Sequence, residues 1–338
     1  MIRGEFRARG KSGQRGVYVY QGSILSVVAD ANTVLPGEAG VLTGVHDLSM
    51  NDSGEVVFEA TGSSGQQGIY FKAGGSLAVV ADRKTPIPGG SGNFTNLSAP
   101  FISKQGEVLF KGDGENDQHG IYSYRGGILA IVADTKTAIP AGKKFFVNFR
   151  HLSINRAGQV VFNGKGRSEQ RGIYIHMGDR LVVVADRNTP LPDGSKTFKA
   201  FRKASIDAEA EITFKAKGKS DQRGIYTDIG GNLAVVADHN TAIPGGAGNF
   251  NLFGIPSIDS GHVAFTANSD NQGGLYTTLG GSLTKVLSLG DPLAGKTVTE
   301  IIFRPDGLKG NNVIFKVIFD DSSRGIYRAV LAASASSS

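Results

Sequence analysis

An aspartate that recurs after Val-Ala is the first residue whose type and spacing suggest chemistry. It occurs five times at intervals of 52 residues, at Asp30, Asp82, Asp134, Asp186 and Asp238. A ring of such carboxylates, with carbonyl oxygens of neighbouring Gly/Pro loops, could bind Ca²⁺. However, one carboxylate per repeat is a poor site for a hard cation, and a Thr follows each Asp three residues later. We therefore favour a turn in which the Asp accepts backbone N–H bonds, and we predict no cofactor and no metal.

Side chains that could catalyse a reaction show no comparable pattern. The six histidines fall at non-equivalent positions of the repeat, and no pair has a metal-ligand spacing. The chain has no Cys and no Gly-x-Ser-x-Gly elbow. Its Gly-rich loops precede apolar runs typical of strands, so they lack the helix N-terminus that holds phosphate in nucleotide-binding loops. We predict a non-enzymatic protein, with an acid/base pair built from loops of different repeats as the alternative.

The elements that position these residues follow from a repeat. The Tyr of a Gly-Ile-Tyr tripeptide, or of a close variant, recurs every 50 to 52 residues, at Tyr18, Tyr70, Tyr122, Tyr174, Tyr226, Tyr276 and Tyr327. One repeat contains four short apolar runs bounded by Gly, Pro, Asn or Ser, at 55–60, 68–71, 77–81 and 97–103. None has the 3.6-residue period of a helix, so each run is predicted to be a strand.

Four short strands per repeat predict an all-β fold, a β-propeller with four-stranded blades. We name the strands A (97–103), B (55–60), C (68–71) and D (77–81). The chain begins in a B strand and ends after a C strand, which favours seven blades with incomplete terminal blades, six being the alternative. A single domain is predicted over 1–331, followed by a Ser/Ala-rich tail at 332–338 that is disordered or fills a gap.

Repeated aromatic residues are predicted to form the core. They are the Gly-Ile-Tyr tyrosines, whose hydroxyl groups are expected to reach a polar partner at the blade rim, and the Phe of each B strand. A further series, Phe94, Phe146, Phe198 and Phe250, lies in the connection from strand D to the next strand A. These rings are expected to hold that long connection against the blade.

Positive charge is concentrated in one part of the chain. The formal net charge is +6, but residues 143–223 hold 17 Lys and Arg against 8 Asp and Glu, a net charge of +9. An up-and-down strand order places the B–C loops and the D-to-A connections on one face, which becomes basic. The candidate binding residues on this face are Lys143, Lys144, Lys165, Arg167, Arg171, Arg187, Lys217, Lys219 and Arg223.

A basic face predicts an anionic partner, such as an acidic polysaccharide, an anionic protein or an anionic surface. The alternative is a solvated face that keeps a Gly-rich protein soluble. Nucleic acid is the least favoured partner, because the basic residues are not interleaved with exposed aromatic residues. A lectin with one neutral-sugar site per blade is also less favoured, since the chain has no Trp.

The segment Asn155-Arg-Ala-Gly158-Gln-Val-Val-Phe162 resembles the repeat named for its Asn-x-x-Gly-x-x-Ala-Phe pattern, and Gly261-His-Val-Ala-Phe265 matches its second half. Bacterial tandem-repeat proteins of this kind are often exported and surface-anchored, so the resemblance implies an extracellular or cell-surface protein. The sequence itself shows no signal peptide and no transmembrane segment. Two alternatives to a binding scaffold are a structural subunit of an extracellular assembly and a propeller hydrolase or lyase with its site at the channel mouth.

Overall fold

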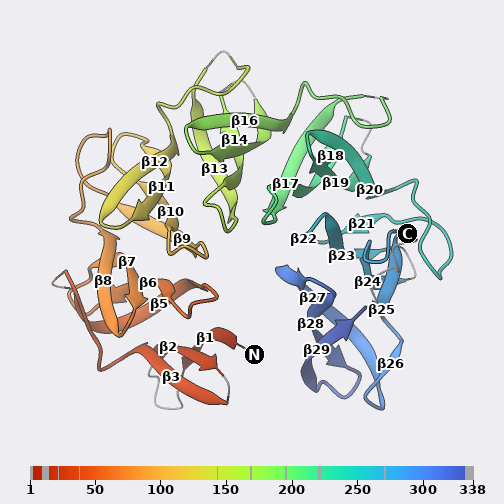
Figure 1. The fold of residues 1–338 in the computed structure, drawn as a ribbon, viewed down its shortest axis with the longest axis horizontal. Helices are drawn as coiled ribbons and strands as arrows, with labels where there is room; N and C mark the ends of the chain where they lie inside the picture. The colour runs from red at the N-terminus through yellow and green to blue at the C-terminus, as the bar shows by residue number, and fades with distance from the viewer. Residues whose placement is uncertain are drawn as a thin grey trace. The chain divides into compact units, whose positions relative to one another are not determined.

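The structure is a computed structural model that describes residues 3–9, 15–21, 23–37, 39–142, 144–167, 170–194, 196–219, 222–269 and 272–331. Every regular element in these ranges is a β-strand (Figure 1), which confirms the all-β prediction. None of these residues belongs to a helix long and apolar enough to cross a bilayer. The chain divides into two compact units, which we call unit 1 (residues 1–149 and 156–158) and unit 2 (residues 150–155 and 159–338).

Unit 1 contains three antiparallel sheets formed by strands that follow one another in the chain. The first has three strands, β1 (Arg3–Arg9), β2 (Arg15–Gln21) and β3 (Ile24–Asp30). The second has five, β4 (Val34–Leu35), β5 (Gly40–Met50), β6 (Val56–Gly62), β7 (Gln67–Ala73) and β8 (Ser76–Asp82). The third has four, β9 (Asn96–Ile102), β10 (Val108–Asp113), β11 (His119–Arg125) and β12 (Ile128–Asp134).

Unit 2 contains four more sheets of the same kind. Strand β13 (Phe146–Ile154) enters it from unit 1 and pairs with β14 (Val160–Gly166), β15 (Arg171–Met177) and β16 (Arg180–Asp186) in order. The next sheet is β17 (Phe198–Ile206), β18 (Ile212–Gly218), β19 (Arg223–Ile229) and β20 (Asn232–Asp238). Then follow β21 (Leu252–Phe253), β22 (Ser257–Asp259), β23 (His262–Asn268), β24 (Gly273–Thr277) and β25 (Thr284–Ser288). The last sheet is β26 (Pro292–Leu293), β27 (Lys296–Lys309), β28 (Asn312–Phe319) and β29 (Arg324–Val330).

Successive sheets within each unit bury apolar side chains between them. In unit 1, Val57 and Ile69 of the second sheet pack with Phe110 and Tyr122 of the third. Val56 lies one position before Val57 on β6, so it points to the opposite face, where it packs against the first sheet. A middle sheet is therefore buried on both faces, which explains why its B strand begins with three consecutive apolar residues. This is how propeller blades pack.

The repeated phenylalanines in the D-to-A connections lie in the core, as predicted. Phe94 is buried, and its ring packs edge-on against Tyr122 with the ring centroids 4.9 Å apart. It also contacts Phe110 at a centroid distance of 5.8 Å. In unit 2, Phe198, which is the first residue of β17 and not part of the connection, and Phe250 pack in the same way against Tyr226 and Tyr276. Each ring therefore fixes a long connection to the sheet that follows it.

The Gly-Ile-Tyr motif places a tyrosine ring over the glycine two residues before it. A Cβ atom added to Gly172 would lie 2.7 Å from the Ala185 carbonyl oxygen and 3.1 Å from the Tyr174 ring. The motif therefore combines a buried ring with a close approach of strands β15 and β16 that leaves no space for a side chain.

Five of the seven Gly-Ile-Tyr tyrosines are buried, as predicted, whereas Tyr18 and Tyr327 in the terminal sheets are only half-buried. The expectation for the hydroxyl groups is wrong in two cases. Among the described residues, the hydroxyl groups of Tyr70 and Tyr226 have no hydrogen-bond partner. Burial, together with the nearby carboxylate of Asp82, raises the pKa of Tyr70 to about 12. The sheets pack over these rings so closely that the hydroxyl groups end inside the core and not at its rim.

The recurrent aspartates at the ends of the D strands form the expected turn. Asp186 Oδ1 accepts hydrogen bonds from the backbone N–H groups of Asn188 and Thr189, at 2.8 and 3.0 Å. The Thr189 hydroxyl lies 3.1 Å from the same oxygen and 2.9 Å from the Asp186 backbone nitrogen. This network explains the Asp-x-x-Thr spacing as a side-chain-closed turn.

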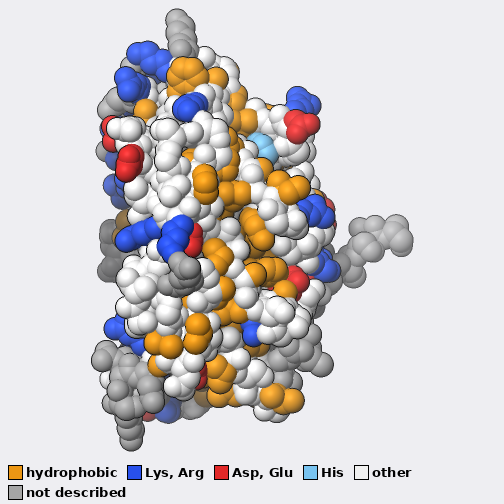
Figure 2. Space-filling model, turned by 90° about the vertical axis from the view of Figure 1, so that its left-hand side faces the viewer, with side chains coloured by type: hydrophobic (Ala, Val, Ile, Leu, Met, Phe, Trp, Pro, Cys, Tyr) orange, Lys and Arg blue, Asp and Glu red, His pale blue; other side chains and the backbone are white. Residues whose placement is uncertain are grey.

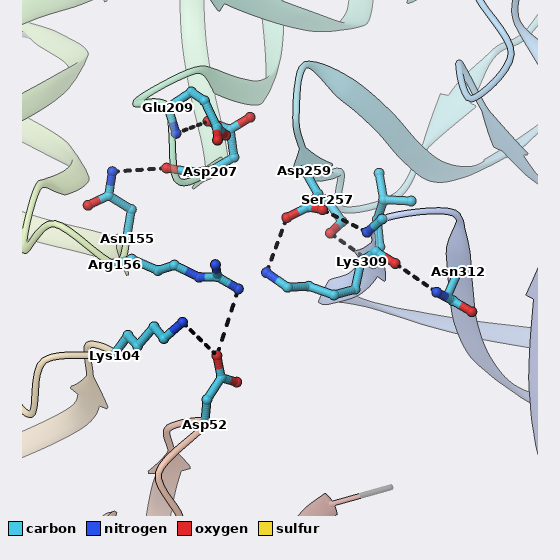
Figure 3. Close-up of polar contacts among 12 residues, drawn as sticks. Asp52, Lys104, Asn155, Arg156, Asp207, Glu209, Ser257, Asp259, Lys309 and Asn312 are labelled. Carbon is cyan, nitrogen blue, oxygen red and sulfur yellow. Dashed lines mark hydrogen bonds and ion pairs between the residues drawn. The ribbon is translucent and has the colours of Figure 1, made fainter. Parts of the chain in front are cut away.

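The Asn of the Asn-x-x-Gly segment connects one sheet to the next. In unit 2, Asn155 Nδ2 donates to the Asp207 carbonyl oxygen, at 2.9 Å, and to Gln159 Oε1, at 2.6 Å (Figure 3). Further along, Asp259 accepts bonds from Lys309 Nζ, at 3.1 Å, and from the Gly310 N–H, at 2.7 Å. The A–B turns of neighbouring sheets are thus joined by polar contacts that repeat with the sequence.

Candidate functional site

Bulges in the A strands project side chains out of the regular pairing. Strand β17 pairs with β18, but the register is interrupted between Phe201 and Ala204. Arg202 and Lys203 occupy the interruption and lie opposite the single residue Lys215. Strand β5 in unit 1 is interrupted in the same way. A bulge bends the strand and changes the direction of its side chains, and such bulges are common beside functional sites.

The bulge of β17 borders a cavity within unit 2, which we call the basic cavity. Its volume is about 230 Å³, and it is lined by His151, Arg202, Lys203, Lys215, Gly254 and Ile255. These residues come from β13, β17, β18 and the segment between β21 and β22. His151 has a φ of 53°, a left-handed conformation that is uncommon for residues other than Gly. The lining contains three Lys and Arg side chains and no carboxylate among the described residues.

The ammonium group of Lys215 lies in a positively charged, partly buried environment at the basic cavity. Burial lowers the pKa of its ammonium group, and the guanidinium groups of Arg202 and Arg223 lower it further. Its Nζ donates a hydrogen bond to the Phe253 carbonyl oxygen. The ammonium is therefore bonded to a neutral acceptor and surrounded by like charge, an arrangement that an anion would stabilise.

Lys215 also has a structural role. Asn163 occupies the equivalent register position one sheet earlier, and its Nδ2 donates to the Arg202 carbonyl oxygen at 3.0 Å. Lys215 makes the corresponding link from β18 to the next sheet. The link itself requires only a hydrogen-bond donor, as Asn163 shows, so it does not explain why a charged group lines the cavity.

The predicted basic residues fall into groups that the strand pairing defines. Lys165 lies opposite Arg171 across β14 and β15, and Lys217 lies opposite Arg223 across β18 and β19. The backbone N–H of Arg187 donates to the Arg171 carbonyl oxygen. Arg167 and Lys219 are exposed, and Lys144 lies in unit 1. Lys143 lies outside the described residues.

The expected common face of loops and connections is present within unit 2. The Lys219 N–H, in the loop between β18 and β19, donates to the Thr197 carbonyl oxygen of the preceding D-to-A connection at 3.1 Å. Lys215 and Lys217 are two residues apart on β18, so they share one side of the sheet, and Arg223 lies opposite Lys217. The cavity residue Lys215 therefore lies on the same side of β18 as the basic end of this hairpin.

Arg202, Lys203 and Lys215 were not among the predicted binding residues, although all lie inside the basic block. The candidates were chosen from loops, and these three belong to strands. One signal was present in the sequence, because the pairs Arg150-His151 and Arg202-Lys203 follow Phe149 and Phe201 at the 52-residue interval. Basic residues at one phase of a repeat should converge when the repeats pack side by side.

The segment Gly290-Asp-Pro-Leu-Ala-Gly-Lys-Thr297 has the spacing of a nucleotide-binding phosphate loop. The expectation that the chain contains no Gly-Lys-Ser/Thr loop of this spacing is therefore wrong. Here it connects β25 to β27 through the short strand β26, and no helix follows it in the described part of the chain. Lys296 Nζ forms an ion pair with Asp321 Oδ2 at 2.7 Å. The segment therefore lacks the helix N-terminus that holds phosphate in such loops.

Three acidic residues, Asp207, Glu209 and Glu211, lie together at one A–B turn. Asp207 Oδ1 accepts the N–H groups of Glu209 and Glu211, at 3.1 and 2.8 Å, and Oδ2 accepts that of Gly261 at 3.1 Å (Figure 3). Partial burial raises the pKa of Glu211, and Asp207 and Glu209 add to the effect. Because both oxygens of Asp207 hold backbone groups, this cluster fits a structural turn better than an acid/base pair.

Residues 4–327 match a protein family described as a family of unknown function, DUF7453. The chain belongs to that family. A search of curated proteins found no match.

Comparison with solved structures finds distant matches to this DUF7453 chain. It resembles an acylaminoacyl peptidase of Pyrococcus horikoshii, with 11% identity and a TM-score of 0.55, over 97% of this chain and 49% of the peptidase. PorZ, a surface component of the type-IX secretion system of Porphyromonas gingivalis, has 13% identity and a TM-score of 0.48, over 99% and 46%. The chain thus spans about half the length of both proteins. At such identity, the likeness to the peptidase concerns the fold alone.

A third match is the β-propeller domain of Cps50 (Swd1) from Myceliophteria thermophila. It has 9% identity and a TM-score of 0.42, over 98% of this chain and 100% of that domain.

Proposed function

We propose that this protein is a non-enzymatic binding scaffold that binds an anionic polymer or surface through the basic cavity and the hairpin ends beside it. One observation carries the proposal, which is the convergence of Arg202, Lys203 and Lys215 on a cavity of about 230 Å³ without a lining carboxylate among the described residues. The half-buried ammonium group of Lys215, with cationic neighbours, is costly unless a counter-charge binds.

The hairpin residues extend the site beyond the cavity. Lys217 and Arg223 lie on the same side of β18 and β19 as Lys215, and Lys165 and Arg171 occupy the equivalent positions one sheet earlier. A linear polyanion could therefore place one group in the cavity and others along these loops. An acidic polysaccharide or an anionic protein surface has this character.

We also propose that the seven sheets in the described residues are the blades of a single propeller, and that the protein acts outside the cell. The in-phase repeat supports the first point, because equivalent repeats build equivalent neighbours. The resemblance of Asn155–Phe162 to exported tandem-repeat proteins supports the second.

The test is retention on an immobilised acidic polysaccharide during a salt gradient. The double variant R202Q/K203Q removes two charges at the cavity, so it should elute at lower salt than the wild type. The control R324Q/R328Q removes two exposed charges from β29, outside the basic block, and should elute with the wild type. Identical elution of all three proteins would contradict the proposal and leave the charge as a solubility feature.

A structural subunit is the second candidate, and exposed apolar side chains favour it. Ile24 on β3 is 67% exposed, and Ile128 on β12 is 72% exposed. Figure 2 shows hydrophobic side chains gathered on the side that carries β8 and β12. If these strands contact other subunits, light scattering after gel filtration should show an assembly that Ile128→Ser weakens. A monomer at all concentrations would remove this candidate.

A further inference from the structure

The positive charge of the basic cavity exceeds what one carboxylate would neutralise. Arg202, Lys203 and Lys215 carry three formal charges, and the described lining offers no acidic side chain. The two charged groups that lower the pKa of Lys215, Arg202 and Arg223, are both cations. A ligand with two negative charges would compensate this site better than a ligand with one.

The size and walls of the cavity restrict the ligand. A volume of about 230 Å³ is below the range of cavities that enclose drug-sized molecules, so a small molecule or one unit of a polymer fits. One wall is Gly254, whose backbone N–H donates to the Thr266 carbonyl oxygen at 2.6 Å. Ile255 adds an apolar surface beside it. The cavity therefore offers a cationic side for an anion and a less polar side for the group that carries it.

The cationic side chains differ in ways that favour a phosphate group. The guanidinium of Arg202 is a planar donor that can bind two oxygens at once, whereas Lys203 and Lys215 are compact charges that suit further oxygens. A phosphate monoester carries a charge of about −1.5 to −2 near pH 7 and presents three acceptor oxygens. A carboxylate carries one charge and two oxygens. We infer that the basic cavity selects a phosphate monoester over a carboxylate, an inference that rests on the proposed anion-binding function.

Calorimetric titration with two ligands of similar size tests this selectivity. Glucose 6-phosphate supplies the monoester and galacturonate supplies the carboxylate. We expect glucose 6-phosphate to bind at least about tenfold more tightly, because it forms more charge-assisted hydrogen bonds. Galacturonate binding as tightly as glucose 6-phosphate would overturn the inference.

Matched variants locate the binding. R202Q/K203Q should weaken glucose 6-phosphate binding by about tenfold or more, since it removes two of the three charges. R324Q/R328Q removes the same charge from exposed positions on β29, outside the cavity lining and the basic block, and should leave the affinity within about twofold. Equal losses in both variants would assign the ligand to the general positive field of the protein and overturn the cavity assignment.

The outcomes for the inference and for the proposed function are distinguishable. If galacturonate and glucose 6-phosphate bind equally and R202Q/K203Q weakens both, phosphate selectivity is wrong but anion binding in the cavity stands. If neither ligand binds and R202Q/K203Q leaves polysaccharide retention unchanged, both are wrong.

A vesicle cosedimentation experiment distinguishes two sources of the phosphate ester, a lipid headgroup and a soluble or polymer-borne ester. Phosphatidylcholine vesicles with and without phosphatidic acid are sedimented with the protein. Cosedimentation that needs phosphatidic acid and is displaced by glucose 6-phosphate supports a lipid headgroup in the cavity. Glucose 6-phosphate binding without vesicle binding supports a soluble or polymer-borne ester. Vesicle binding that glucose 6-phosphate cannot displace would contradict occupation of the cavity.

Discussion

At the scale of single residues, Lys215 combines a half-buried ammonium group with two neighbouring guanidinium groups. Its lowered pKa increases the fraction of neutral amine at a given pH. We expect Lys215 to be acetylated by acetic anhydride at lower pH than Nα-acetyl-lysine in solution, as measured by peptide mass spectrometry across a pH series. Arg202→Gln should move this profile toward that of the free amino acid, because one of the two cations is gone. A profile identical to free lysine would contradict the electrostatic description.

Tyr226 tests the core at the same scale. Its ring is fully buried, and its hydroxyl group has no hydrogen-bond partner among the described residues. Tyr226→Phe removes a polar group that is desolvated without compensation, so the free energy of unfolding should be unchanged or slightly higher. Urea denaturation measures the difference. A loss above about 1 kcal/mol would show that the hydroxyl group makes a favourable hydrogen bond.

At the scale of elements, the repeat predicts strands well because each strand is apolar over a short run and is bounded by Gly, Pro or Asn. Strand β9, for example, covers Asn96–Ile102, within one residue of the predicted 97–103. The Asp-x-x-Thr turns and the phenylalanines of the D-to-A connections were also predictable, since residue type and spacing determine them.

The basic cavity was not predictable in the same way. It depends on the interrupted register between β17 and β18, which places Arg202 and Lys203 opposite one residue. Hydrophobic patterning does not specify that interruption, because polar residues on a strand are compatible with either register. The residues from three different sheets that line the cavity meet only through packing.

The Gly-Ile-Tyr glycine provides an element-scale prediction. Gly172→Ala would place a methyl group against the Ala185 carbonyl oxygen and the Tyr174 ring, so β15 and β16 must separate or the ring must move. Overpacking of this kind costs about 1–3 kcal/mol. We expect a lower free energy of unfolding in urea by that amount.

Gly178→Ala is the control for this substitution. Gly178 lies in the tight turn between β15 and β16 with φ of 59°, and a Cβ there meets nothing within 4 Å. The cost should be limited to the left-handed backbone, about 1 kcal/mol. If Gly172→Ala is no more destabilising than Gly178→Ala, the close approach does not explain the motif.

At the scale of the whole molecule, charge distinguishes one part of a repetitive chain from the rest. The seven described sheets have equivalent core residues at equivalent positions of the repeat, whereas the net charge of +9 belongs to residues 143–223 alone. A purely structural repeat has no need for such a difference. The proposed function therefore requires that an anionic ligand contact this region, and the cavity within it, more strongly than other basic surfaces.

Lysine footprinting tests that claim most directly. The full chain is acetylated briefly with and without a soluble acidic polysaccharide at low salt, and the modification of each lysine is quantified by mass spectrometry. Binding at the basic cavity predicts the strongest protection at Lys203 and Lys215, weaker protection at Lys165, Lys217 and Lys219, and little at Lys72 or Lys309. Uniform protection, or protection centred on lysines outside residues 143–223, would contradict binding at the basic cavity.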